Sequence, residues 1–335
     1  MPFRPTSMPG RAKLSIVLTR SSSAVSGSVP GHIPVLLSEA VDALNVRPGG
    51  VYVDGTFGAG GHTREILARD ETASVIAFDR DLAAIPRAEA LATEVGPDRF
   101  TFVHASFADL GEVLDSHGRS TVDGVLLDLG VSSFQFDQAE RGFSFRFEGP
   151  LDMRFDTSTG ESAADLLATR DEAEIADILW TYGEERRSRQ IARAVVQRRD
   201  REPITTTSDL AALVERVVGR GKSGHHPATR TFQALRIAVN GELDALEAVL
   251  PVAVERLSQG GRISIISFHS LEDRIVKQFI AREVSPCICP PEQPVCTCGK
   301  VARLRRVGAK IRPSTGEQHD NVRSRSAILR VAERI

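Results

Sequence analysis

A glycine-rich turn at residues 54–63 constrains the fold of this chain more than any other stretch. It reads Asp-Gly-Thr-Phe-Gly-Ala-Gly-Gly-His-Thr. Residues 51–53 before it are β-branched or aromatic and predict a short buried strand, and residues 64–69 after it predict a helix. This order is typical of a nucleotide-binding α/β fold, because glycine permits positive φ and lets a ligand approach the backbone. The N–H groups at the start of the helix then face the ligand.

The spacing of the glycines narrows the class of ligand. A nicotinamide dinucleotide needs G-x-G-x-x-G under its pyrophosphate and an acidic residue about 20 positions further on. Here the pattern is G-x-x-G-x-G-G, Asp54 directly precedes it, and the next predicted strand, 75–78, ends in Asp79. Asp79 is placed to accept both hydroxyls of a ribose, and an acid at the turn suits an ammonium group. These features favour S-adenosylmethionine, and hence a methyltransferase over a nicotinamide-dependent oxidoreductase.

The segments on either side of this turn alternate between helices and strands. The sequence predicts helices over 32–46, 82–95 and 107–114 and strands over 100–104 and 122–129. Such β-α repetition predicts a doubly wound parallel sheet.

The alternation stops after the fourth strand. Residues 140–227 show no convincing strand. The helices predicted there are 165–167, 172–182, 184–199 and 208–218, the last with Ser208 as a candidate N-cap. The pattern then predicts one long helix over 230–257, a strand over 262–268, a helix over 271–282 and a closing strand over 327–331. We infer one α/β domain with a helical insertion between its fourth and fifth strands.

Composition excludes several protein classes. The chain of 335 residues is long enough for a sizeable core, and its formal net charge of −2 provides no global attraction for nucleic acid. No apolar run is long enough to span a bilayer. Residues 1–31, rich in Ser and without Asp or Glu, are interpreted as a disordered tail. All four cysteines fall within residues 287–298, unlike a secreted disulfide framework, which favours a cytoplasmic location.

The cysteines form two Cys-x-Cys pairs, Cys287 with Cys289 and Cys296 with Cys298. Four thiolates this close in sequence can bind zinc tetrahedrally, yet the spacing departs from the usual Cys-x-x-Cys knuckles. Both alternatives stay open, and the sequence assigns no metal ligand. Cytosine C5 methylation by Cys287, which follows a proline, is discounted because the pair lies far beyond the fourth strand.

Six blocks resemble, in order, one known family. They are GTFGAGGHT (55–63), LDLGVSS (127–133), ERGFSF (140–145), GPLDMR (149–154), HPATRTFQ (226–233) and SIISFHSLEDR (264–274). The chain is thereby similar to the RsmH (formerly MraW) family, bacterial enzymes that methylate N4 of a cytidine in the decoding region of 16S ribosomal RNA. The resemblance runs from residue 32 to the C-terminus, apart from the cysteine segment.

The resemblance implies a class I (Rossmann-like) methyltransferase fold that is split by the insertion. Residues 32–137 and 228–335 would form the methyltransferase domain, and residues 138–227 an all-helical domain for RNA recognition. It also implies S-adenosyl-L-methionine as cofactor and 16S ribosomal RNA, within the small ribosomal subunit, as partner. The cofactor contacts that it implies are Gly60, Gly61, His62, Asp79, Phe107, Asp128 and Gln135.

Methylation of an exocyclic cytosine amine requires a hydrogen-bond acceptor, because the nitrogen lone pair is delocalised into the ring. Many amino methyltransferases place Asp/Asn-Pro-Pro-Tyr/Phe after the fourth strand for this purpose. This chain has Asp128-Leu-Gly-Val-Ser-Ser instead, so Asp128 and nearby carbonyls are the candidate acceptors. Phe134 and Phe136 either stack on a flipped base or pack the start of the insertion. His269 either contacts the base or caps the next helix.

Two arginine-rich runs are candidate phosphate contacts. The first lies in the insertion (Arg186, Arg187, Arg189, Arg193, Arg198, Arg199 and Arg201), and the second near the C-terminus (Lys300, Arg303, Arg305, Arg306, Lys310 and Arg312). A competing hypothesis is a non-catalytic RNA-binding assembly factor. The intact glycine turn with Asp79 and Asp128 argues against it, because a pure binder has no use for them.

Overall fold

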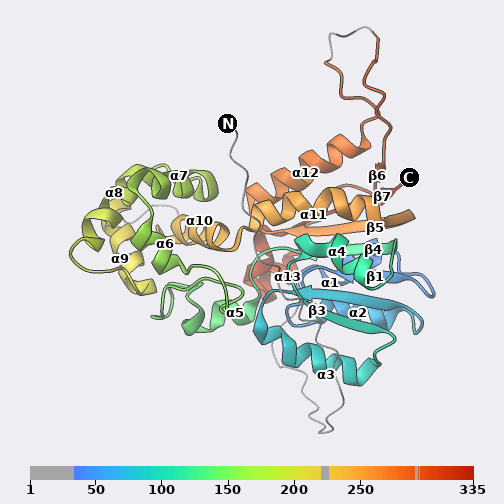
Figure 1. Cartoon of the computed structure of the whole chain (residues 1–335), viewed down its shortest axis with the longest axis horizontal. Helices are drawn as coiled ribbons and strands as arrows, with labels where there is room; N and C mark the ends of the chain where they lie inside the picture. The colour runs from blue at the N-terminus through green and yellow to red at the C-terminus, as the bar shows by residue number, and fades with distance from the viewer. Residues whose placement is uncertain (1–33, 220–225, 291–292, 294) are drawn as a thin grey trace, which may run out of the picture.

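The computed structural model describes residues 34–219, 226–290, 293 and 295–335. The predicted tail 1–31 and most of the predicted loop at 219–224 lie outside these residues. A seven-stranded sheet forms the centre of the molecule (Figure 1). Its strands are β1 (Val51–Asp54), β2 (Ser74–Asp79), β3 (Phe100–His104), β4 (Val122–Asp128), β5 (Leu257–Ser267), β6 (Leu304–Arg306) and β7 (Ile328–Arg334).

The strand order is β3-β2-β1-β4-β5-β7-β6. Strands β1 to β5 are parallel, and β7 runs antiparallel to β5 and β6. The order reverses between β1 and β4, which is where a doubly wound sheet opens a crevice at the carboxyl ends of its strands. The class I, Rossmann-like sheet expected from the sequence is confirmed.

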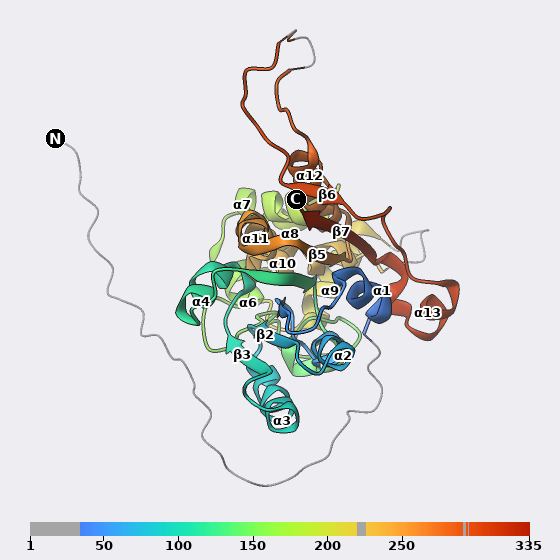
Figure 2. The same ribbon diagram turned by 90° about the vertical axis from the view of Figure 1, so that its right-hand side faces the viewer.

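Alternating side chains of the strands build one apolar core on each face of the sheet. Tyr52 packs with α1 (Leu37–Leu44), α2 (Gly61–Arg69) and α3 (Ile85–Val95), whereas Val53 faces the other core. The helices that cover that second face are α4 (Leu110–Ser116), α11 (Glu242–Arg256) and α12 (Ser270–Val284). Figure 2 shows α1 and α2 on one side of the strands and α4 and α11 on the other.

The helical insertion leaves the sheet after β4 and has an apolar core of its own. Its helices are α6 (Ala163–Thr169), α7 (Glu172–Gly183), α8 (Ser188–Arg199) and α9 (Thr207–Val218). They pack at one end of the molecule, beside the sheet (Figure 1). Two short helices, α5 (Ser133–Asp137) and α13 (Thr315–Asp320), lie close to the edge of the sheet (Figure 1).

The structure corrects three local predictions. The helix predicted over 230–257 is two helices, α10 (Thr229–Asn240) and α11, because Gly241 has a φ of +60° between them. Helix α8 begins only at Ser188, since Glu184 adopts a left-handed conformation that ends α7. The N-cap of α9 is Thr206, whose side chain accepts the Asp209 N–H, and not Ser208.

Helix α10 packs with the insertion. Phe232 and Leu235 belong to the same apolar core as α7 and α9, although the sequence-based division assigned α10 to the sheet domain. None of the helices in the described residues is long and apolar enough to cross a membrane.

Candidate active site

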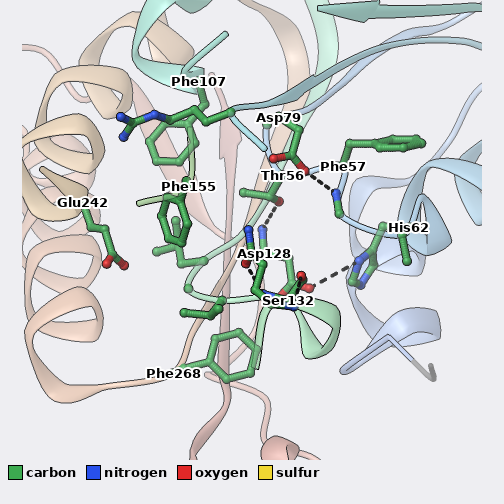
Figure 3. A pocket seen from close by; sticks show the side chains of 18 of the residues that line it. Thr56, Phe57, His62, Asp79, Phe107, Asp128, Ser132, Phe155, Glu242 and Phe268 are labelled. Atoms are coloured by element: carbon green, nitrogen blue, oxygen red, sulfur yellow. Dashed lines mark hydrogen bonds and ion pairs between the residues drawn. The ribbon is translucent and has the colours of Figure 1, made fainter. Parts of the chain in front are cut away.

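The carboxyl ends of β1, β2, β4 and β5 surround a cavity. Its walls come from the glycine turn after β1, from Asp79 and Asp128 at two strand ends, and from Phe155 and Glu242 on the side of the insertion (Figure 3). Because parallel strands end at the same edge of the sheet, residues far apart in sequence meet here. The cavity therefore lies where the sheet domain and the insertion adjoin.

A hydrogen bond and close packing fix the conformation of the glycine turn. Gly58 has a φ of +53°, and its N–H donates to Asp79 Oδ2 at 2.7 Å. A Cβ on Gly60, whose φ is +79°, would lie 2.8 Å from the Phe57 ring, and one on Gly61 would lie 2.2 Å from the Pro34 side chain. Gly61 lines the cavity and Gly60 does not. Gly60 is thus required for the turn itself.

Asp79 offers carboxylate lone pairs to the cavity. Its Oδ2 accepts the Gly58 N–H, and its Oδ1 accepts the Asp81 N–H at 2.8 Å. Each oxygen keeps a second lone pair, as a ribose with two hydroxyls would need. Burial raises the pKa of Asp79 to about 6, against two backbone hydrogen bonds that lower it.

Three acidic residues, Asp54, Asp128 and Glu272, lie close to one another and to His62. Asp54 accepts hydrogen bonds from Thr63 Oγ1 at 2.6 Å and from the Thr56 N–H at 3.0 Å. Asp128 Oδ2 lies 3.7 Å from His62 Nδ1, and Asp128 Oδ1 is buried without a hydrogen-bond partner among the described residues. Burial, together with the charges of Asp54 and Glu272, raises the pKa of Asp128 well above its ordinary value.

This surplus of acid suits a cationic ligand. Burial also raises the pKa of Asp54, although His62 and the two threonines oppose the rise. Glu272 is different, because His269 and Arg236 outweigh its desolvation and lower its pKa. A positive charge in the cavity would relieve the repulsion between Asp54 and Asp128, and would favour their ionised forms.

Phenylalanines form much of the apolar part of the wall, three of them outside the glycine turn. Phe107 follows β3, Phe155 belongs to the segment before α6, and Phe268 directly follows β5. In Figure 3, Phe155, Phe268 and Glu242 lie on one side of Asp128, and Asp79 and His62 lie on the other. The cavity can therefore hold one polar ligand and one flat aromatic group on opposite sides of Asp128.

Comparison with known proteins decides the family. A model of the MraW methylase family matches residues 30–335. The chain belongs to the MraW methylase family. It is 53% identical to "Ribosomal RNA small subunit methyltransferase H" of Thiobacillus denitrificans over 91% of this chain and 98% of that protein. It is 54% identical to the protein of the same name from Thermomicrobium roseum, over 91% and 94% of the two chains. The solved structure of an rRNA methylase from Streptococcus thermophilus matches 91% of this chain and 99% of its own, with 11% identity and a TM-score of 0.42.

As an MraW-family methylase, the protein uses S-adenosyl-L-methionine as methyl donor. The residues present fit this cofactor, whose sulfonium supplies an electrophilic methyl group and whose tail carries an ammonium. Asp79 offers acceptors for ribose hydroxyls, and Phe107 a face for adenine. Asp128, whose Oδ1 has no hydrogen-bond partner among the described residues, and its neighbour Asp54 can ionise to balance a bound cation.

Six of the seven cofactor residues predicted in this MraW-family chain line the cavity: Gly61, His62, Asp79, Phe107, Asp128 and Gln135. Gln135 has structural partners as well. Its Oε1 accepts the Ser132 N–H at 2.9 Å, and its Nε2 donates to Asp81 Oδ2 at 2.8 Å. It therefore connects the loop after β4 to the loop after β2.

The structure shows protein contacts for the three side chains whose role the sequence left open. Phe136 lies under the Arg323 guanidinium and packs against the insertion core, and Phe134 lies under Arg87. Neither lines the cavity. His269 is the N-cap of α12, where its ring nitrogen accepts the Glu272 N–H, and it does not line the cavity either.

Three further residues that line the cavity, Phe155, Phe268 and Glu242, are not among those expected from the sequence. A signal existed for Phe268, because it directly follows the fifth predicted strand and so had to lie at the site edge. Phe155 and Glu242 carry no such signal, since their position depends on how the insertion folds back.

Proposed function

We propose that this MraW-family methylase transfers a methyl group to the exocyclic N4 amine of a cytidine in the decoding region of 16S ribosomal RNA. The names of its relatives support a ribosomal RNA substrate. The observation that carries the proposal is the position of Asp128: it lines the cavity between the glycine turn and the Phe155–Phe268 wall, and its Oδ1 has no hydrogen-bond partner among the described residues.

The chemistry follows from that position. Asp128 would accept a hydrogen bond from the N4 amine, which localises the nitrogen lone pair and orients it toward the methyl group. Phe155 and Phe268 would stack on the cytosine once it is turned out of its helix. In this assignment Asp128 is the catalytic residue and also contacts the cofactor. Gly60, Gly61, His62, Asp79, Phe107 and Gln135 hold the cofactor with it, and Gly60 acts only through the shape of the turn.

The helical insertion would recognise the RNA. We propose that it extends from residue 138 through α10, beyond the boundary at 227 that the sequence suggested, because α10 shares its core. Arg186 and Arg189 are exposed on it and available for phosphates, whereas Arg199 donates to the Leu167 and Arg170 carbonyls. A substrate in the small ribosomal subunit would also place the protein in the cytoplasm.

The direct test is methyl transfer from labelled cofactor. Small ribosomal subunits and naked 16S RNA from cells lacking this modification would each be incubated with the protein, and the labelled nucleoside would be identified after digestion. We expect N4-methylcytidine at a single site, and the two substrates show whether the protein needs the assembled subunit. Label in C5-methylcytidine or in another base would refute the proposal. Tight RNA binding without any transfer would favour the non-catalytic alternative.

A further inference from the structure

The connection between α12 and β6 lacks an apolar core. It comprises residues 285–303, and its described part contains no helix or strand. Figure 1 shows this part extending away from the sheet, beyond α12 and β6. Its apolar side chains are turned outward, with Ile288 63% and Val295 68% exposed. A connection this long needs some other constraint to adopt one conformation.

Among the described residues of the connection, Lys300 and Arg303 near its end make hydrogen bonds that join it to the rest of the molecule. Lys300 Nζ donates to the carbonyls of Arg282 and Ser285 at 2.7 and 2.6 Å. The Arg303 N–H donates to the Glu283 carbonyl at 2.9 Å. These contacts bring the two chain segments together at the end of α12, but they leave the residues beyond Ser285 without support from the sheet.

Within the connection, the sulfur atoms of four cysteines lie close together. The Sγ atoms of Cys287 and Cys296 are 3.5 Å apart, those of Cys296 and Cys298 are 3.6 Å apart, and those of Cys298 and Cys287 are 3.8 Å apart. All four Sγ atoms, including that of Cys289, lie within 4.8 Å of one another. Tetrahedral zinc with Zn–S bonds of about 2.3 Å requires S···S separations of about 3.8 Å. The set therefore has the dimensions of a mononuclear site.

Backbone N–H groups point at three of the four sulfurs. The Cys289 N–H points at Cys287 Sγ, with an N···S distance of 3.3 Å. Backbone N–H groups of Ile288 and Lys300 donate to Cys298, and that of Thr297 donates to Cys289. Hydrogen bonds of this kind to ligand atoms fix their orientation and spread the negative charge of a tetrathiolate site.

We propose that Cys287, Cys289, Cys296 and Cys298 bind one Zn²⁺ ion in a closed tetrahedral site that fixes the connection between α12 and β6. Four protein ligands leave no open position, so the role is structural. No cysteine lines the cavity described above. Binding displaces the remaining thiol protons, so zinc affinity falls as pH is lowered.

The test begins with metal analysis of the full-length protein, purified under reducing conditions without added zinc. We expect about one equivalent of zinc per chain, and replacement by Co²⁺ should give the absorption of tetrahedral cobalt thiolate. In the double variant Cys287→Ser, Cys296→Ser, zinc should fall below about a tenth of an equivalent. Limited proteolysis should then cleave that variant within 286–302, whereas the wild type stays intact there.

Thr297→Ala is the matched control. It lies between two ligands and loses a hydroxyl that contacts Gln293, but it keeps all four sulfurs and its backbone N–H, so it should retain full zinc. Unchanged binding of S-adenosylmethionine by the double variant would show that the body has folded. The proposal is overturned by wild-type protein that neither contains zinc nor takes up Co²⁺, by zinc retained in the double variant, by disulfides in the native protein, or by stoichiometric iron in place of zinc.

Discussion

At the scale of single residues, ligand binding in the cavity depends on acidic side chains that burial shifts toward their protonated forms. Asp79 and Asp128 both have raised pKa values, for the shared reason that burial penalises their charged forms. A ligand that donates hydrogen bonds or carries positive charge restores the charged forms. Binding and protonation are therefore linked at this site.

For Asp79, the linkage predicts a pH-dependent affinity for S-adenosylmethionine. Its pKa is about 6 without ligand, and only the carboxylate accepts hydrogen bonds from two ribose hydroxyls. Affinity should therefore be constant above about pH 7 and fall by up to about tenfold per unit below pH 6. Calorimetry between pH 5 and 8 measures this. Asp79→Asn should bind more weakly and lose the acid limb. An unchanged limb in that variant would assign it to another group.

For Asp128, the raised pKa predicts an effect on stability. The folded protein binds this proton more tightly than the unfolded chain, so stability falls as pH rises above the unfolded value of 3.8. Asp128→Asn removes that penalty. Without cofactor, the gain in Tm of the variant over the wild type should be larger at pH 8 than at pH 5, while methyl transfer is lost. Thermal unfolding of both proteins at the two pH values measures this difference in Tm. A difference at pH 8 that is equal to or smaller than that at pH 5 contradicts the prediction.

At the scale of elements, the strand–turn–helix unit was predictable from local pattern. The β-branched runs and the acids that follow them located β1, β2 and β4 and placed their tips in one crevice. β6, a three-residue Leu-Arg-Arg strand, carries no pattern and was missed. The break at Gly241 did carry one, since Asn240-Gly241 is a typical helix end, but the apolar periodicity on both sides masked it.

The glycine turn predicts a difference between two substitutions. Gly60 and Gly241 are both left-handed, but a Cβ at Gly60 would meet the Phe57 ring at 2.8 Å, whereas one at Gly241 meets nothing within 4 Å. Gly60→Ala should lower the free energy of unfolding by about 1–3 kcal/mol more than Gly241→Ala, because the ring must move. Chemical denaturation measures both. Equal losses of unfolding free energy would show that the Phe57 ring moves aside at no cost in stability.

At the scale of the whole molecule, two bodies share one cavity. Arg141 forms one joint between them: its Nη1 donates to both Asp81 oxygens at 3.0 and 2.8 Å, and its Nη2 donates to the Arg154 and Phe155 carbonyls. Asp81 lies just beyond Asp79, and Phe155 lines the cavity wall. This geometry also explains why the sequence could not place Phe155. Its position depends on a buried ion pair between segments 60 residues apart.

Breaking that joint should affect stability and activity together. Arg141→Ala leaves Asp81 buried without its cationic partner, which should cost about 3–5 kcal/mol of unfolding free energy. It should also reduce kcat for methyl transfer, because the Phe155 carbonyl loses its hydrogen bond to Arg141, one of the contacts that hold this segment. The matched control is Arg193→Ala, which removes an exposed ion pair with Glu172 and should cost less than about 1 kcal/mol. Full kcat in Arg141→Ala would show that the position of Phe155 does not depend on the Arg141–Asp81 ion pair.

The position of the insertion has a consequence for how the chain acquires its fold. β4 and β5 are neighbours in the sheet, yet residues 129–256 separate them along the chain. Closing so long a loop costs entropy, and collapse of the helical core first would shorten the span to be closed. During synthesis, β4 therefore waits with an unpaired edge until the helices have formed and β5 has emerged. That interval, rather than any weakness of the finished sheet, is when nascent chains are most prone to pair with one another.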